Sequence, residues 1–244
     1  MKSIRIYHPG QFETGQAVHL DRSASHHLLR VLRLKNQQAF ILFNGEGREY
    51  SAQLEISGKT AIAHIETSHC VSNESHLKIH LLQGVSKGER MDFAIQKSIE
   101  LGVNRITPII CERTVVNLKG ERQNKKLQHW QNLAISTCEQ CGRNILPEVS
   151  PIKPLTDALQ NNEEGDCLKL LLDPLSQLSL NSIETRNHNI TLLIGPEGGL
   201  SENEIAQAGQ NDFNGVQLGP RVLRTETAAL AAITALQVLW GDLG

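Results

Sequence analysis

The chain has 244 residues, of which 39% are apolar and 4% aromatic, with 24 lysines and arginines against 26 aspartates and glutamates. This composition excludes a disordered chain, a collagen-like fibre and a disulfide-stapled scaffold. The five cysteines are an odd number at irregular spacings, which indicates reduced thiols. No apolar stretch is long enough to span a bilayer, so we expect a cytoplasmic protein with no membrane partner.

Charge is distributed unevenly along the chain. Residues 1–148 carry 19 basic and 14 acidic side chains, whereas residues 149–244 carry 5 and 12. The first 35 residues are the most basic, with six lysines and arginines against two acidic side chains. This bias predicts a surface that meets an anion such as nucleic acid, although a solvated basic face would have the same composition.

Short strands joined by turns are predicted for residues 1–72. Residues that tolerate positive φ occupy two hairpin tips, Asn44–Gly47 and Ser57–Lys59. A short helix over His26–Leu34 would present Arg30 and Arg33 outward. Together these features predict a small antiparallel β-barrel or sheet with strands at Ile4–Tyr7, Ala39–Phe43, Arg48–Ile56 and Ala61–Thr67.

Beyond residue 73, strand-like runs alternate with helical patterns. Strands are predicted at Leu77–Gln83, Arg105–Cys111, Cys167–Asp173, Ile190–Ile194 and Val216–Leu218, and helices at Glu89–Leu101, Asn124–Cys141, Glu202–Ala208 and Glu226–Trp240. This alternation predicts an α/β domain, residues 73–244, in which helices cover a parallel sheet. A short polar connection separates it from the first domain, residues 1–72.

The predicted strand Ile190–Ile194 runs directly into a glycine-rich bend, Gly195–Gly199. Ser201 and Glu204 then form a capping box that opens the next helix. A strand, a bend and a helix in this order make a ligand-binding corner at the edge of a sheet. Glu197 within the bend would repel phosphate, so a nucleoside cofactor that lacks phosphate and carries positive charge fits better. Alternatively, the glycines only make a tight turn.

A second Gly-Pro bend, Leu218–Arg221, follows the next strand. Thr225 is the predicted N-cap of the last helix, which Gly241 stops. This helix is apolar on nearly every side, so we expect it to lie between the sheet and another body such as a second subunit. The alternative is that it only fills the core of one chain.

Four segments together resemble a known family, namely Gln96–Gly102, Cys138–Asn144, Ile194–Ser201 and Leu218–Ala228. They are similar to motifs of the RsmE family of 16S rRNA uridine N3-methyltransferases, in the SPOUT superfamily. Arg5–His8 and Arg30–Arg33 resemble that family's PUA-like RNA-binding domain. The resemblance implies a trefoil knot in the α/β domain, a homodimer, S-adenosyl-L-methionine as cofactor, and methyl transfer to N3 of one uridine in the 16S rRNA of the small ribosomal subunit.

The matched motifs also imply the site residues. The cofactor is expected to contact mainly backbone and apolar groups, at Leu172, Gly195, Pro196, Gly199, Leu218, Gly219, Leu223 and Thr225. Reaction at N3 needs a base, or a cation that stabilises the uridine anion. Arg224 is expected to hold the base edge or the developing anion, and Glu226 to accept the proton directly or through water. Arg143 is a third candidate, which would reach in from the partner subunit. A structural pair or a cap contact is the alternative for each. RNA is expected to contact Arg5, Arg30, Arg33, Lys87 and Arg90.

Other functions remain compatible with these residues. A non-catalytic RNA-binding factor in small-subunit assembly would keep the fold and the basic domain. A SPOUT methyltransferase acting on tRNA or on a ribose 2′-hydroxyl would share the cofactor loops. Cys138 and Cys141 form a C-x-x-C pair, but no second ligand pair follows at a matching spacing, so we expect no metal.

Overall fold

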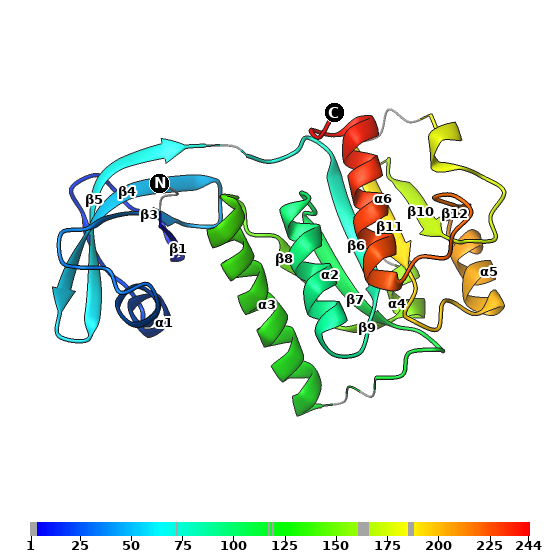
Figure 1. Cartoon of the computed structure of the whole chain (residues 1–244), viewed down its shortest axis with the longest axis horizontal. Coiled ribbons are helices and arrows are strands. Elements are labelled where there is room, and N and C mark those ends of the chain that lie inside the picture. Colours follow the sequence, from blue (N-terminus) through cyan, green and yellow to red (C-terminus); the bar gives the residue numbers. More distant parts are fainter. Residues whose placement is uncertain (1–3, 72, 117, 119, 161–165, 185–187) are drawn as a thin grey trace. The chain divides into compact units, whose positions relative to one another are not determined.

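The computed structural model describes residues 4–71, 73–116, 118, 120–160, 166–184 and 188–244. The chain forms two compact units (Figure 1). One runs up to Glu74 and includes Ile135–Leu146; the other comprises Ser75–Ala134 and Pro147–Gly244. The division into functional domains at residue 72 stays a proposal, and the compact units differ from it because Ile135–Leu146 belongs to the first.

The first unit contains a five-stranded sheet in the order β1-β3-β4-β5-β2. Its strands are β1 (Arg5–Tyr7), β2 (Ala17–His19), β3 (Ala39–Phe43), β4 (Arg48–Ser57) and β5 (Thr60–Cys70). All pairs are antiparallel except β1 with β3, which is parallel. The predicted small sheet is confirmed, whereas β2 was not predicted.

A helical segment of the first unit begins earlier than predicted. Asp21 caps α1 (Arg22–His26) by accepting a hydrogen bond from the Ala24 N–H at 2.8 Å. A π-helical turn, η1 (His27–Val31), continues it. Leu28 points into the core and is fully buried, while Arg30 is exposed as predicted. The segment therefore packs by its apolar side and presents its cations to solvent.

The second unit contains a seven-stranded sheet in the order β12-β10-β11-β6-β7-β8, with β9 also paired to β7. Its strands are β6 (Lys78–Gly84), β7 (Arg105–Ile110), β8 (Glu148–Val149), β9 (Lys153–Pro154), β10 (Leu168–Leu172), β11 (Asn189–Ile194) and β12 (Asn214–Val216). Every pair is parallel. The predicted parallel sheet is confirmed, and the carboxyl ends of its strands share one edge.

Helices cover this sheet. They are α2 (Glu89–Glu100), α3 (Glu121–Cys141, whose last turns belong to the first unit), α4 (Leu155–Leu159), α5 (Glu202–Gln210) and α6 (Thr225–Trp240), with a 3₁₀ turn η2 at Leu180–Ser182. Figure 1 shows α2 and α6 side by side, and α6 also packs on β6 and β11. Residues of α4 and α5 pack on Leu82, Leu171 and Leu193 of the sheet. Apolar side chains thus bury the sheet between helices, as is typical of parallel sheets.

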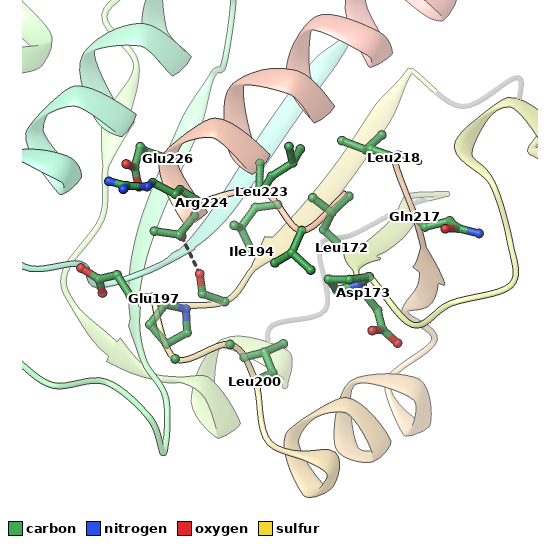
Figure 2. A pocket seen from close by; sticks show the side chains of 18 of the residues that line it. Leu172, Asp173, Ile194, Glu197, Leu200, Gln217, Leu218, Leu223, Arg224 and Glu226 are labelled. Carbon is green, nitrogen blue, oxygen red and sulfur yellow. Dashed lines mark hydrogen bonds between the residues drawn. The ribbon is translucent and has the colours of Figure 1, made fainter. Parts of the chain in front are cut away.

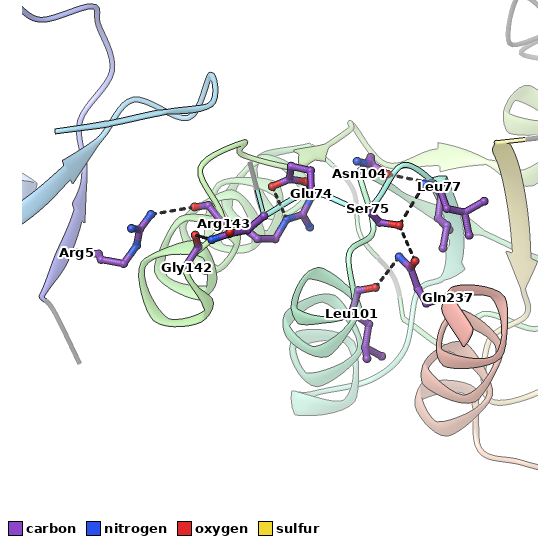
Figure 3. Close-up of polar contacts among 11 residues, drawn as sticks. Arg5, Glu74, Ser75, Leu77, Leu101, Asn104, Gly142, Arg143 and Gln237 are labelled. Carbon is purple, nitrogen blue, oxygen red and sulfur yellow. Dashed lines mark hydrogen bonds and ion pairs between the residues drawn. The ribbon is translucent and has the colours of Figure 1, made fainter. Parts of the chain in front are cut away.

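Buried polar side chains fix the ends of these helices. Ser75 donates a hydrogen bond to Gln237 Oε1 at 2.8 Å, and Gln237 Nε2 donates to the Leu101 carbonyl at 3.0 Å (Figure 3). This links the end of α6 to the end of α2 and to the segment before β6. Gly102, with φ +91°, ends α2 as predicted. In the described part of the chain, no helix is long and apolar enough to cross a membrane.

A second polar cluster joins α2 to α3 within this unit. Asp92 accepts hydrogen bonds from Trp130 Nε1 at 2.9 Å and from His129 Nε2 at 2.8 Å, and Lys126 Nζ lies 3.9 Å away. Burial opposes ionisation of the carboxyl, but the two hydrogen bonds and the nearby cation outweigh it and lower the Asp92 pKa.

Candidate active site

A cavity of about 510 Å³ lies in the second unit. Three segments line most of it, around Leu172–Leu175 after β10, Ile194–Leu200 after β11, and Gln217–Glu226 between β12 and α6. All eight residues predicted to hold a cofactor lie in its lining. The cavity therefore sits at the carboxyl edge of the parallel sheet, where ligands of such sheets bind.

The glycine-rich bend rests closely on the end of β6. A Cβ atom added to Gly84 would lie 2.6 Å from the Gly195 carbonyl carbon and would also overlap the Pro196 nitrogen. Gly84 therefore lets two stretches of backbone approach each other. The bend also needs glycine at its end, because Gly199 has φ +70°. No atom lies within 4 Å of the Cβ position at Gly199 or Gly219, so both leave open space beside the cavity.

A hydrogen-bond chain ties the two bends together. Gln83, fully buried at the end of β6, donates through Nε2 to Thr225 Oγ1 at 2.9 Å. Thr225 Oγ1 donates in turn to the Gly195 carbonyl at 2.6 Å. The prediction that Thr225 is the N-cap of α6 was wrong: Arg224 occupies the cap position, and the hydroxyl bridges to the other bend instead. This bridge fixes the spacing of the bends.

Glu197, the acidic residue of the first bend, contacts residues around the start of α2. Glu197 Oε1 accepts a hydrogen bond from the Lys87 N–H at 2.8 Å and lies 3.4 Å from Arg90 Nη1. On the other side, Arg113 Nη1 donates to the carbonyls of Gly198 and Leu200, both at 3.2 Å. The loop between β6 and α2 and the segment after β7 therefore anchor the bend.

The cavity has an apolar middle and polar ends (Figure 2). Leu172, Ile194 and Leu223 lie together in the middle, which suits a flat apolar ring. Asp173 and Gln217 lie at one side, while the side chains of the Arg224–Glu226 segment lie together at the other. Arg224 and Glu226 are thus separated from the polar groups near Leu172.

Of the described side chains with a buried polar atom that lacks a hydrogen-bond partner, Glu226 is the one that lines the cavity. Its Oε2 is buried and has no hydrogen-bond partner among the described residues, although the residue lines the cavity. A buried carboxylate oxygen without a partner is costly, so it indicates a ligand or substrate group that is to be bound there. Arg224 beside it is exposed and lines the same cavity, as do Arg90 and Arg221.

Arg143 is not part of the cavity lining. It lies in the first unit, where Nη2 is 2.5 Å from Glu74 Oε2 and Nε donates to Glu74 Oε1 at 3.1 Å (Figure 3). Both side chains are 5% exposed. This buried two-point ion pair is the structural role that was the alternative for Arg143.

Arg5 is likewise engaged within the first unit. It forms an ion pair with Glu49 at 2.7 Å, hydrogen bonds to Asn144 Oδ1, and lies over the Phe43 ring at 5.0 Å. Its side chain is 8% exposed, so little of it is available to RNA. Arg30 and Arg33 are both exposed, and Arg33 adopts φ +55°.

The two remaining RNA-contact predictions are Lys87, on the loop before α2, and Arg90, in the first turn of α2. Both contact Glu197, and both side chains are exposed. Arg90 also lines the cavity. Among the described residues, no group of three or more metal-ligating side chains occurs. The Cys138 thiol has a raised pKa because Cys141 hydrogen-bonds to it and because it is buried, which makes thiolate ligation unfavourable there.

A model of the RNA methyltransferase domain matches residues 73–237, and a model of the RNA methyltransferase PUA domain matches residues 20–66. A protein of Buchnera aphidicola named ribosomal RNA small subunit methyltransferase E is 40% identical over 240 residues, covering 98% of this chain and 97% of its own. The chain belongs to this methyltransferase family. A Bacillus subtilis member is 28% identical over 95% of both chains.

Solved structures agree with this membership of the methyltransferase E family. A Neisseria gonorrhoeae ribosomal RNA small subunit methyltransferase E bound to S-adenosyl methionine superposes with a TM-score of 0.92 at 42% identity, covering 99% of this chain and all of that one. A Legionella pneumophila methyltransferase in complex with SAM gives 0.96 at 42% identity, with both chains fully covered. The predicted SPOUT-type α/β fold and the PUA domain are thereby confirmed.

Several residues of the site were not expected from the family motifs. Gln83 and Gly84 hold the two bends, and Asp173, Gln217 and Arg221 line the cavity. A polar residue followed by glycine, directly after the two leucines at the end of a strand, was the available signal for the first two. Nothing in the sequence shows that this strand lies beside both bends, because that depends on the strand order.

Proposed function

We propose that this chain transfers a methyl group from S-adenosyl-L-methionine to N3 of a uridine in the 16S rRNA of the small ribosomal subunit. Membership of the methyltransferase E family supports the reaction class. The observation that carries the site assignment is the buried Glu226 Oε2, which has no partner among the described residues yet lines the cavity beside Arg224.

The cavity fits the cofactor in size and in chemistry. Its volume of about 510 Å³ lies within the usual range for small-molecule sites. The apolar middle suits adenine, and the open positions beside Gly199 and Gly219 let a ligand approach backbone groups closely. We propose the same cofactor contacts as the motifs imply, at Leu172, Gly195, Pro196, Gly199, Leu218, Gly219, Leu223 and Thr225. When bound, the cofactor supplies an electrophilic methyl group.

Uridine N3 carries a proton that must leave before its lone pair can attack. In this proposal the Glu226 carboxylate accepts that proton at Oε2, the oxygen that protein donors leave unsatisfied. The Arg224 guanidinium stabilises the negative charge that develops on the uracil carbonyl oxygens. Because Arg224 is held at the N-terminus of α6 and Glu226 lies in its first turn, one helix positions both groups.

Two substitutions test these roles. Arg224→Ala is expected to abolish methyl transfer to small subunits and to change cofactor affinity by no more than a few fold. Glu226→Gln is expected to lower kcat by about 10²- to 10⁴-fold. Glu202→Gln, an exposed acid on α5 outside the cavity, is the matched control. Unchanged turnover in Arg224→Ala or Glu226→Gln contradicts the assignment of that residue.

We further propose the trefoil knot, a homodimer and a cytoplasmic location. Support for the dimer comes from α6, where Val238 is 51% exposed and Leu239 is 44% exposed, and from Leu243 and Phe93, at 50% and 46%. Exposed apolar side chains of one unit, on α2, on α6 and just after α6, favour burial against a second copy. Sedimentation equilibrium measures this directly: a concentration-independent monomer contradicts the dimer.

A further inference from the structure

A second cavity, of about 410 Å³, lies within the first unit. It is bordered by the helical segment α1–η1 on one side and by the hairpin tip between β4 and β5 on the other. Basic residues recur at every fourth position of the helical segment and once at the hairpin tip: Arg22, His26, Arg30 and Lys59. Two elements far apart in sequence therefore bring cations to one concave surface.

No acidic side chain lines this cavity in the part of the chain that the structure describes. Acids adjacent in sequence are engaged elsewhere. Asp21 caps α1 and lies 3.8 Å from His8. Glu55 lies 2.5 Å from His64 on the neighbouring strand. The positive charge of the cavity is therefore not neutralised by the residues next to it.

The three permanent cations are available to a ligand. Arg22, Arg30 and Lys59 are exposed, and none of them forms an ion pair with another described residue. Apolar side chains complete the lining, among them the buried Leu34 and Ile56, which is 37% exposed. Cations beside apolar side chains suit a group that carries negative charge on a sugar-like body.

We infer that this cavity binds a phosphodiester group of the RNA backbone through Arg22, Arg30 and Lys59. The inference rests on the proposed function, since it takes RNA as the substrate. Arginine side chains hold phosphate oxygens in two-point hydrogen bonds, and lysine adds a point charge. Such contacts fix the position of the RNA without selecting a base. Arg22 and Lys59 thereby take the role that was predicted for Arg5, which is buried in its pair with Glu49.

Filter binding of the full-length protein to 16S rRNA, between about 50 and 200 mM KCl, tests the inference. Arg22→Gln, Arg30→Gln and Lys59→Gln are each expected to weaken RNA binding by about three- to tenfold. Each lost phosphate contact is also expected to reduce the slope of log K, the association constant, against log[KCl] by about 0.7–0.9. Arg48→Gln is the matched control, because Arg48 is an exposed cation of the same unit that hydrogen-bonds to Ser68 and lies outside the cavity.

The triple variant of Arg22, Arg30 and Lys59 decides the outcome once circular dichroism shows that it is folded. Unchanged affinity and slope relative to Arg48→Gln overturn the inference, even when methyl transfer by the wild-type chain is demonstrated. Conversely, weaker binding and a smaller slope support the cavity even if the wild-type chain transfers no methyl group. The cofactor affinity of the triple variant should equal that of the wild type, because its cavity lies in the other unit.

Discussion

Substitution of Gly84 by alanine should displace the first bend of the active site. The added Cβ would lie 2.6 Å from the Gly195 carbonyl carbon, whereas ordinary contact begins at 3.4 Å, so the backbone must move by about 1 Å. Overpacking of this kind lowers the free energy of unfolding by about 1–3 kcal/mol. A displacement of about 1 Å in a catalytic site can also reduce turnover by about 100-fold.

Calorimetry and single-turnover methyl transfer measure the two effects separately. A loss of about 2 kcal/mol lowers the Tm by about 4–8 °C for a domain of this size. Gly209→Ala is the matched control, since it adds the same methyl group within α5 where no atom lies within 4 Å. This control should keep or slightly raise the Tm, because alanine favours a helix. If Gly84→Ala retains the turnover and Tm of the control, the close approach of the two backbones is refuted.

Three further predictions concern partly or fully buried groups. Asp92→Asn should lower the free energy of unfolding at pH 7. Because the pKa of Asp92 is lowered in the folded state, its carboxylate stabilises the fold above the unfolded pKa of about 3.9, and this stabilisation is lost as the pH falls through the folded pKa. Urea titrations of the variant and the wild type should therefore converge at low pH. Glu74→Gln should cost about 3–5 kcal/mol by urea unfolding, since it removes the charge of the buried carboxylate that pairs with Arg143, whereas replacing both by apolar residues should cost far less. Burial raises the pKa of Cys111 to about 12, so iodoacetamide at pH 8 should label the exposed Cys70 and spare Cys111; equal labelling contradicts the burial.

Periodicity and turn chemistry predicted most elements of this fold. The capping box of Ser201 and Glu204 forms as expected and starts α5. The stop at Gly241 is likewise observed for α6. These signals are local, because each depends on hydrogen bonds between residues close in sequence. For the same reason, the helix ends could be predicted from the sequence without knowing the strand order.

Tertiary contacts decided what the local signals could not. The hydroxyl of Thr225 has the chemistry of an N-cap, but it donates instead to the carbonyl of Gly195, 30 residues away. The pairing of Arg143 with Glu74 joins residues 69 positions apart, which no spacing rule addresses. In both cases the sequence predicts the hydrogen-bonding capacity of the side chain, while the fold chooses its partner.

The central claim is methyl transfer to uridine N3 in small-subunit rRNA. The most direct test supplies methyl-labelled S-adenosyl-L-methionine and small ribosomal subunits from cells that lack this protein, followed by digestion of the RNA and identification of the labelled nucleoside. We predict label in 3-methyluridine and a loss of that label with Arg224→Ala. Label in a ribose-methylated nucleoside or in tRNA alone, or no label in subunits and naked rRNA alike, would contradict the claim.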